Sequence, residues 1–418
     1  MTGSDGAISG GSPLPHPADD AAPPPQPVHS GHELPTLLSG GPATPPAPRR
    51  KHRGVFLGVL GGVAVAIALG SAQLATNLGY DAAEEGFQDA LTTATSNQSA
   101  LQDDLLGLEQ VNSAATTIAA SDSGTLLDAG SKDALVTAAS SGESTAAEAR
   151  DLLDDRLPAA GDKPVWFWEL LGATQELERY GDAADEQSGE LQDASRAAAE
   201  EASAVHDAGL AALASAASAA QPFEAAHPSA RNLDVIALRD AAEEAEYASA
   251  LDQTAVDAFT GLESAAAQVI ASEQAELAEK AGPLQGTRLA VESFARSLAP
   301  GVLLDFDWAP LVNGFGYDGG MGGYTTWWYD DGGYSTIQLS NSVAEQWPSA
   351  RSQALVAHEV GHAISVKCVG MYDTSTQDSI EKWATGWAIG MGYADDANGV
   401  WAYGYPPQSY IDAAAGCR

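Results

Sequence analysis

Two histidines and a glutamate near the C-terminal end of the chain have the types and spacing of a metal site. His358, Glu359 and His362 lie in the segment ALVAHEVGHAIS. Residues four apart on a helix share one face, about one turn apart, so the two imidazoles could bind one zinc ion. The intervening carboxylate would lie beside the open metal position, where it could accept a proton from water. The spacing therefore predicts a hydrolytic zinc site.

The third zinc ligand must come from another part of the sequence, because a catalytic zinc ion usually takes three protein ligands. None of the eight histidines lies after His362, and the two cysteines form no CxxC pair. The acidic candidates downstream are Asp373, Asp378, Glu381, Asp395 and Asp396. Glu381 is the best of these, because it lies on the next predicted helix, whose apolar stripe would pack against the first helix. Asp373 and Asp378 lie in the connecting loop.

The elements around these residues predict a small α+β domain. The segments GVLLDFDW, YTTWWYDD and GYSTIQLS predict three strands, the last two joined by a turn at 331–333. Pro348 fits the first turn of the helix that carries the histidine pair, and Gly370 is a plausible end for it. We expect the strand over Tyr334–Ser340 to hold an extended peptide substrate at a sheet edge. Four tyrosines could stabilise the oxyanion, and the sequence does not choose between Tyr393, Tyr403, Tyr405 and Tyr410.

The segment HEVGH and the helix after it resemble the zincin metallopeptidases, and within them the gluzincins. The resemblance also uses the preceding strand, and it covers roughly the last 120 residues. It implies that His358, His362 and Glu381 bind Zn2+ and that Glu359 is the general base. Many gluzincins have an acid four residues after the ligand glutamate, where this chain has Thr385. The carboxylate that would orient one imidazole ligand is missing there.

The composition of the 418-residue chain bears on its partners and on the organisation of its N-terminal part. With 19 Lys and Arg against 57 Asp and Glu, the formal net charge is −38, so a nucleic-acid partner is not expected. Residues 1–53 are rich in Pro, Gly, Ser and Ala, which predicts a disordered tail. The uncharged run Gly54–Ala72 follows the basic cluster RRKHR and predicts a single transmembrane helix within 54–78. The basic flank then predicts a cytoplasmic tail and an extracytoplasmic remainder.

The region 79–282 predicts long, Ala-rich helices in a coiled-coil-like hairpin or bundle that turns near 221–232. One column at seven-residue spacing consists of Leu177, Ala184, Leu191, Ala198, Val205 and Ala212. Small residues four places after each member let neighbouring helices approach closely. No polar cluster in this region suggests a catalytic or ligand site, so we expect a stalk that holds the head away from the membrane, with self-association or partner binding as the alternative role.

Two cysteines, Cys368 and Cys417, predict a disulfide bond. Both lie in the C-terminal region, no other cysteine competes with either, and the predicted extracytoplasmic location would favour a disulfide. In the chain-entropy model, closing a loop of this length contributes about 4 kcal/mol to stability.

The sequence as a whole predicts a mainly α protein with a C-terminal α+β head over 283–418. The predicted function is that of a zinc peptidase anchored in the cell membrane, with a peptide or protein substrate in the cell envelope. The alternative is a partner-binding helical protein whose head is a metal-stabilised or inactive remnant. The threonine at position 385 and the small head favour this alternative, whereas the intact Glu359 favours the enzyme.

Overall fold

The computed structural model describes residues 53–418, so the predicted disordered tail over 1–53 lies almost entirely outside the described residues. The chain divides into two compact units, Met1–Ile67 and Ala68–Arg418. The second unit contains the rest of the first helix, together with all later helices and the three strands among the described residues. The candidate metal ligands therefore belong to the second unit.

The predicted membrane anchor is wrong by the criteria of length and apolarity. The run Gly54–Ala72 is helical, but it begins α1 (Arg53–Ser121), a helix of 69 residues. Among the described residues, no helix is long and apolar enough to cross a membrane. The transmembrane helix of the expected fold and the expected cell-membrane location are therefore wrong, and the lipid contact expected through that helix loses its basis.

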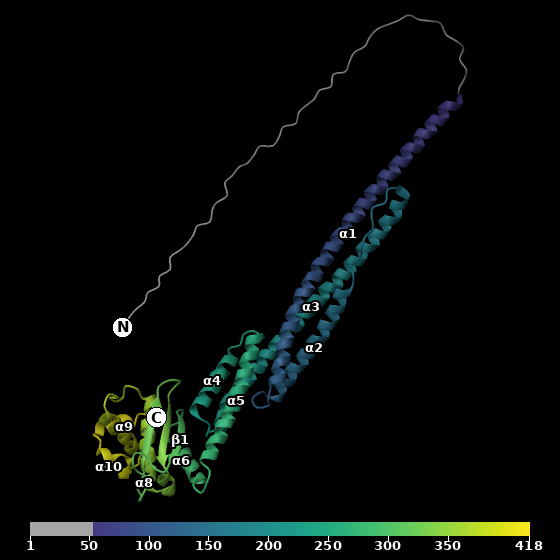
Figure 1. Ribbon diagram of the computed structural model, residues 1–418. Coiled ribbons are helices and arrows are strands. Elements are labelled where there is room, and N and C mark those ends of the chain that lie inside the picture. Colours follow the sequence, from purple (N-terminus) through teal and green to yellow (C-terminus); the bar gives the residue numbers. More distant parts are fainter. Residues whose placement is uncertain (1–52) are drawn as a thin grey trace, which may run out of the picture. The chain divides into compact units, whose positions relative to one another are not determined.

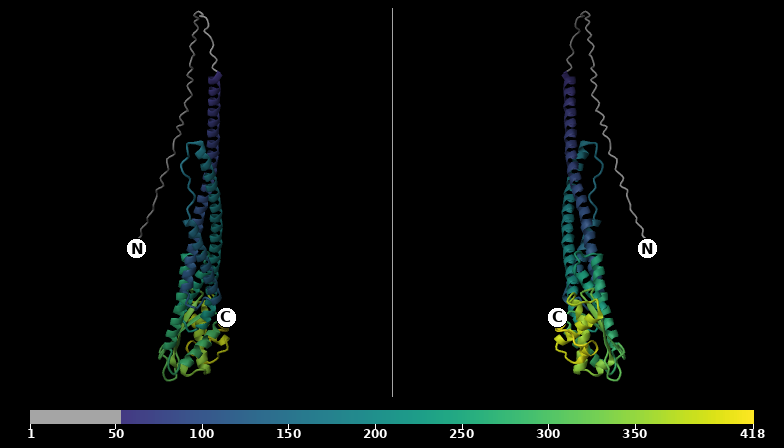
Figure 2. Two further views of the ribbon diagram at one scale, coloured as in Figure 1. Left: turned by 90° about the vertical axis from the view of Figure 1, so that its right-hand side faces the viewer. Right: turned by 90° about the vertical axis from the view of Figure 1, so that its left-hand side faces the viewer.

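Three long helices form the first part of the second unit. Besides α1 they are α2 (Ala129–Asp154) and α3 (Phe167–Ala226), which lie alongside the later part of α1 (Figures 1 and 2). Asn97 on α1 donates a hydrogen bond of 3.1 Å to the Ser188 carbonyl oxygen on α3. The seven-residue column predicted for this region is buried throughout, at Leu177, Ala184, Leu191, Ala198, Val205 and Ala212. Small side chains in this seam let the helices pack closely.

Three further helices connect this bundle to the head. They are α4 (Asn232–Glu246), α5 (Gln253–Glu279) and α6 (Gln285–Leu298). The chain turns between α3 and α4 at residues 227–231, inside the predicted turn region. Asp252 begins α5 by accepting hydrogen bonds from the amides of Thr254 and Ala255, two of the amides that have no partner within the helix. The hairpin of α4 and α5 thus places the start of one helix and the end of the other beside the head.

The head contains a three-stranded sheet in the order β1–β3–β2. The strands are β1 (Leu303–Ala309), β2 (Gly323–Trp328) and β3 (Tyr334–Ser340), close to the three predicted segments. β1 runs parallel to β3, and β2 runs antiparallel to it. Since β3 is the central strand, it cannot add a substrate strand at an edge, and the prediction for Tyr334–Ser340 is wrong. The free edge beside the candidate site belongs to β2.

Two crossing helices carry the motif residues of the head. They are α8 (Ala350–Ala363) and α9 (Gln377–Gly390), and α8 continues into the 3-10 turn η1 (Ile364–Lys367). Pro348 precedes the capping residue Ser349, and the helix ends well before the expected Gly370. A Cβ atom on Gly361 would lie 2.8 Å from the Ala384 carbonyl oxygen, so glycine is what allows α8 and α9 to cross this closely.

Short elements complete the head, and a disulfide fastens the last of them. These elements are α7 (Asn341–Glu345), η2 (Asp396–Asn398), α10 (Val400–Tyr403) and α11 (Gln408–Ala414). A disulfide joins Cys368, just after η1, to Cys417, with the two Cα atoms 6.0 Å apart. Trp387 on α9 donates a hydrogen bond of 3.0 Å to the Cys417 carbonyl oxygen. The predicted location outside the membrane no longer supports this bond, but the number of cysteines still does.

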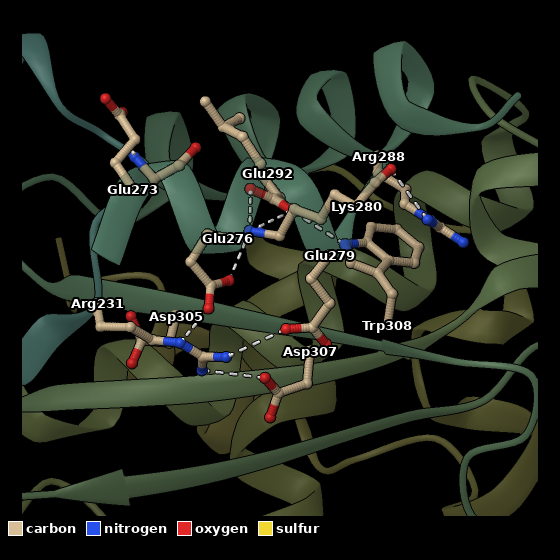
Figure 3. A network of polar contacts seen from close by, with 12 residues as sticks. Arg231, Glu273, Glu276, Glu279, Lys280, Arg288, Glu292, Asp305, Asp307 and Trp308 are labelled. Carbon is tan, nitrogen blue, oxygen red and sulfur yellow. Dashed lines mark hydrogen bonds and ion pairs between the residues drawn. The ribbon is translucent and has the colours of Figure 1, made fainter. Parts of the chain in front are cut away.

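A buried network of charged side chains joins the α4–α5 hairpin to the head (Figure 3). The Lys280 ammonium lies 3.1 Å from a carboxylate oxygen of Glu276 and 3.2 Å from one of Glu292. Arg231, just before α4, pairs with Glu276 and with Asp307 on β1. Glu292 also accepts a hydrogen bond of 2.9 Å from the indole of Trp308. We call Arg231, Glu276, Lys280, Glu292, Asp305, Asp307 and Trp308 the charge network.

Candidate metal centre

Three predicted ligands meet between α8 and α9. Nε2 of His358 lies 3.2 Å from Oε2 of Glu381, and Nε2 of His362 lies 3.3 Å from the same oxygen. The two Nε2 atoms are 3.2 Å apart, and all three side chains are buried. The other acidic candidates do not join them, because Asp373 and Asp378 are exposed. Asp395 and Asp396 instead pair with Arg351.

The ionised carboxylate of Glu381 is the electrostatic feature of this triad, His358, His362 and Glu381, that suits a bound cation. Burial alone would raise the pKa of Glu381, but hydrogen bonds from both imidazoles hold that pKa well below its ordinary value. Burial acts to lower the pKa of His358, yet the hydrogen bond to Glu381 and the charge of Glu359 give a net increase. Two nitrogens and one carboxylate oxygen, all within 4.8 Å of one another, suit zinc in type and number. The residues therefore fit the metal that the sequence predicts.

His358 is oriented by a backbone carbonyl instead of a carboxylate. Its Nδ1 lies 3.0 Å from the Asn398 carbonyl oxygen, which can only accept, so Nδ1 carries a proton, and Nε2, which faces Glu381, is the nitrogen that would bind a metal. The Thr385 hydroxyl lies farther away, at 3.4 Å. Gly399 has φ +103°, and a Cβ atom there would lie 2.6 Å from Nδ1 of His358. The turn at Asn398 and Gly399 thus supplies the partner that is missing at position 385.

His362 is oriented by an aromatic contact. Its ring stacks on Trp327 of β2 with centroids 5.6 Å apart and planes 6° apart. Its Nδ1 has no hydrogen-bond partner among the residues that the structure describes. The flat indole surface therefore replaces the hydrogen bond that holds His358.

Glu359 lies beside the triad, at the wall of a cavity of about 320 Å³. Its Oε2 accepts a hydrogen bond of 2.7 Å from the Thr325 hydroxyl on β2. Apolar groups of the cavity wall come from Phe315, Met321, Leu355, Ala397 and Trp401. Gly320 and Gly322 from the Gly-rich segment before β2 also line the cavity, as does Gly323, the first residue of that strand. The cavity therefore brings a carboxylate, an imidazole and apolar surface together in one place.

Among the four candidate tyrosines, only Tyr403 lines this cavity. Its ring stacks on His358 with centroids 5.9 Å apart, and burial together with the charges of Glu381 and Glu359 raises its pKa to about 12. The Tyr410 hydroxyl is hydrogen-bonded to Ser379 at 3.0 Å. Tyr393 packs edge-on against Phe294, and Tyr405 is largely exposed. Of the four tyrosines, Tyr403 is therefore the one that lies beside the candidate site.

Sequence reasoning missed three residues that contact the predicted site: Thr325, Trp327 as the partner of His362, and Asn398. The sequence Asn398–Gly399 signals a turn, but nothing in it indicates contact with His358. Thr325 and Trp327 alternate on a strand, which shows that they share a face but not what that face covers. No family model, curated protein or solved structure matches this chain, so the site rests on its own residues.

Proposed function

We propose that this protein is a zinc-dependent peptidase with its active site at the triad. The single observation that carries the proposal is the convergence of three buried ligand atoms beside Glu359 on the wall of an open cavity. The resemblance of HEVGH and Glu381 to the gluzincins supports the same function. A purely structural metal site would instead have closed coordination and no adjacent base facing a cavity.

Each chemical role in the proposal falls to a residue of the head. His358, His362 and Glu381 would hold the metal, which when bound acidifies water and polarises a carbonyl group. Glu359 accepts the proton from the attacking water and passes it to the leaving amine. The raised pKa of Tyr403 keeps its hydroxyl protonated near neutral pH, so it donates a hydrogen bond to the oxyanion.

The substrate backbone is held by the free edge of β2. The Ser340 amide donates a hydrogen bond to the Gly322 carbonyl oxygen at 2.9 Å. This bond fixes which residues of β2 direct their peptide groups toward β3 and which direct them away, because the two kinds alternate along an antiparallel strand. By that alternation, Thr325 and Trp327 direct their peptide groups away from β3, toward the open edge. An extended peptide can add a strand there and place its scissile bond beside Glu359. The apolar cavity wall at Met321 and Leu355 favours an apolar side chain next to that bond.

Zinc analysis and peptide cleavage by the full chain test the proposed function. We expect one zinc ion per chain and cleavage of a mixed peptide library, detected by mass spectrometry. Glu359→Gln should keep zinc and lose turnover by about 100- to 10,000-fold, because the base is not a ligand. Glu345→Gln, an exposed change on α7, is the matched control and should leave both unchanged.

The outcomes separate the proposed peptidase from its rival. A folded wild-type chain without zinc would contradict the metal site as a whole. A zinc-loaded chain that cleaves no peptide would instead favour a non-catalytic head that is stabilised by metal.

A further inference from the structure

One face of β2 contacts two residues of the motif on α8, the proposed base Glu359 and the proposed metal ligand His362. Gly323, Thr325 and Trp327 alternate along the strand, so they lie on the same face of the sheet. Gly323 and Thr325 both lie against Glu359, and Trp327 stacks on His362. The edge strand therefore does more than offer peptide groups to a substrate, because its buried face touches the base and a ligand.

The Thr325 hydroxyl fixes one of the two carboxylate oxygens of Glu359. Thr325 is buried and lies 2.7 Å from Oε2 of Glu359, and 3.1 Å from the Glu359 carbonyl oxygen. A hydroxyl has one proton, so it serves one acceptor at a time, and the charged oxygen at the shorter distance is the stronger acceptor. When Glu359 takes up a proton, the carbonyl oxygen remains as the alternative acceptor.

Gly323 leaves room for the other carboxylate oxygen. A Cβ atom at this position would overlap Oε1 of Glu359 and lie 2.7 Å from its Cδ. Any side chain on Gly323 would therefore push the carboxylate out of its present place. Gly323 and Glu359 both line the cavity, from which a substrate and water would approach.

We propose that Thr325 is a positioning residue for the general base: its hydroxyl holds Oε2 of Glu359, and Gly323 leaves Oε1 free to take the proton. This inference rests on the proposed peptidase function. It assigns the two oxygens of one carboxylate to different tasks, one to anchoring and one to proton transfer. A hydrogen bond to a charged group that orients the base should affect turnover more than substrate binding.

The test compares Thr325→Val with Thr325→Ser in the full, zinc-loaded chain. Valine keeps the shape and removes the hydroxyl, whereas serine keeps the hydroxyl. We expect Thr325→Val to lower kcat by about 10- to 100-fold with KM changed by less than about twofold. Thr325→Ser should restore most of the lost turnover. Zinc content and the visible spectrum of the Co2+-substituted protein should stay unchanged, because no ligand is altered.

A second measurement does not depend on activity. The infrared difference between the wild type and Glu359→Gln isolates the Glu359 carboxylate band among the many other acids. The same difference in the Thr325→Val background should show that band shifted, because one oxygen has lost its donor. Gly323→Ala should also shift the band, by displacing the carboxylate.

Several results would overturn the inference and leave the proposed function standing. These are an unshifted carboxylate band, a Thr325→Val enzyme with wild-type kcat, or serine that rescues nothing. Loss of zinc or of folding in Thr325→Val would give Thr325 a structural role and overturn the inference as well. A wild type that binds zinc but cleaves nothing would remove the proposed function, and with it the role of Thr325, whatever the infrared band shows about the contact.

Discussion

The charge network and the metal-ligand triad are both buried polar clusters, but only one of them is complete. In the charge network the acids face cations: Lys280 lies between Glu276 and Glu292, and Arg231 pairs with Asp307. In the triad the ligand atoms face each other, and no lysine or arginine among the described residues pairs with them. Buried charges need partners, so the first cluster is neutralised by its own cations, whereas the second would be neutralised by the metal ion that we propose.

The strongest test of this contrast is removal of the third ligand. Glu381→Ala should lower zinc affinity by more than about 100-fold, beyond what loss of an outer-shell partner costs. Asp378→Ala, at an exposed position on the same helix, is the control and should bind zinc normally. Zinc content measured by elemental analysis after dialysis decides between them. Release of the metal by Asp378→Ala instead would contradict the ligand assignment.

Breaking the charge network should be costly without any involvement of metal. Lys280→Met removes the cation buried between Glu276 and Glu292. Arg231 and Arg296 still pair with these acids, but loss of one partner from a buried ion pair typically destabilises a fold by about 3–5 kcal/mol. Lys382→Met removes an ion pair to the exposed Asp378 and should change stability by less than about 1 kcal/mol. Urea unfolding with and without a chelator measures both. A destabilisation by Lys280→Met that disappears in the chelator would mean that the two clusters are not independent.

The charge network should also respond to pH. Burial raises the pKa of Asp305 to about 6, so the folded chain binds more protons than the unfolded chain between about pH 4 and pH 6. The stabilisation from this group is complete below about pH 4 and is lost as the pH rises through about 6. The size of this contribution is on the order of 3 kcal/mol. Chemical unfolding across this range should show it for the wild type and not for Asp305→Asn. An identical pH dependence in both would exclude Asp305 as its source.

The smallest effect is expected at Thr385. Its hydroxyl is the more distant of two partners of His358 Nδ1, so Thr385→Val should weaken zinc binding by less than about threefold. Gly399→Ala is the informative companion, because its Cβ would displace His358 and the turn that carries the Asn398 carbonyl. That variant should lose about 10- to 100-fold in affinity. Equal losses in both variants would show that Thr385 orients the imidazole after all.

Local spacing explains which parts of the site could be predicted. His358, Glu359 and His362 lie on one helix, and helical geometry alone puts them on one face. Glu381 could be found because an apolar stripe on the next helix indicates packing against the first. The seam of small residues in α3 could be found in the same way, from a period within one helix.

Contacts between distant segments could not be predicted, because no local pattern encodes them. Asn398 reaches His358 across 40 positions, and Thr325 reaches Glu359 across 34. The order of strands is likewise a property of the assembled sheet, which is why β3 was expected at an edge and lies at the centre. The anchor prediction failed for another reason: an uncharged run with a basic flank is typical of a span, but the run begins a 69-residue helix, and no helix among the described residues is long and apolar enough to cross a membrane.

The position of the charge network limits how the head could be exchanged between genes. A segment that starts at residue 283 would carry Glu292 without Lys280, and Asp307 without Arg231. It would also lose Asn232, whose side chain donates a hydrogen bond of 2.9 Å to the Ser335 carbonyl oxygen on the central strand. Recombination at that point would therefore separate acids from the bases that neutralise them. The smallest segment that keeps these charge pairs together with the candidate metal centre begins before Arg231 and includes α4 and α5.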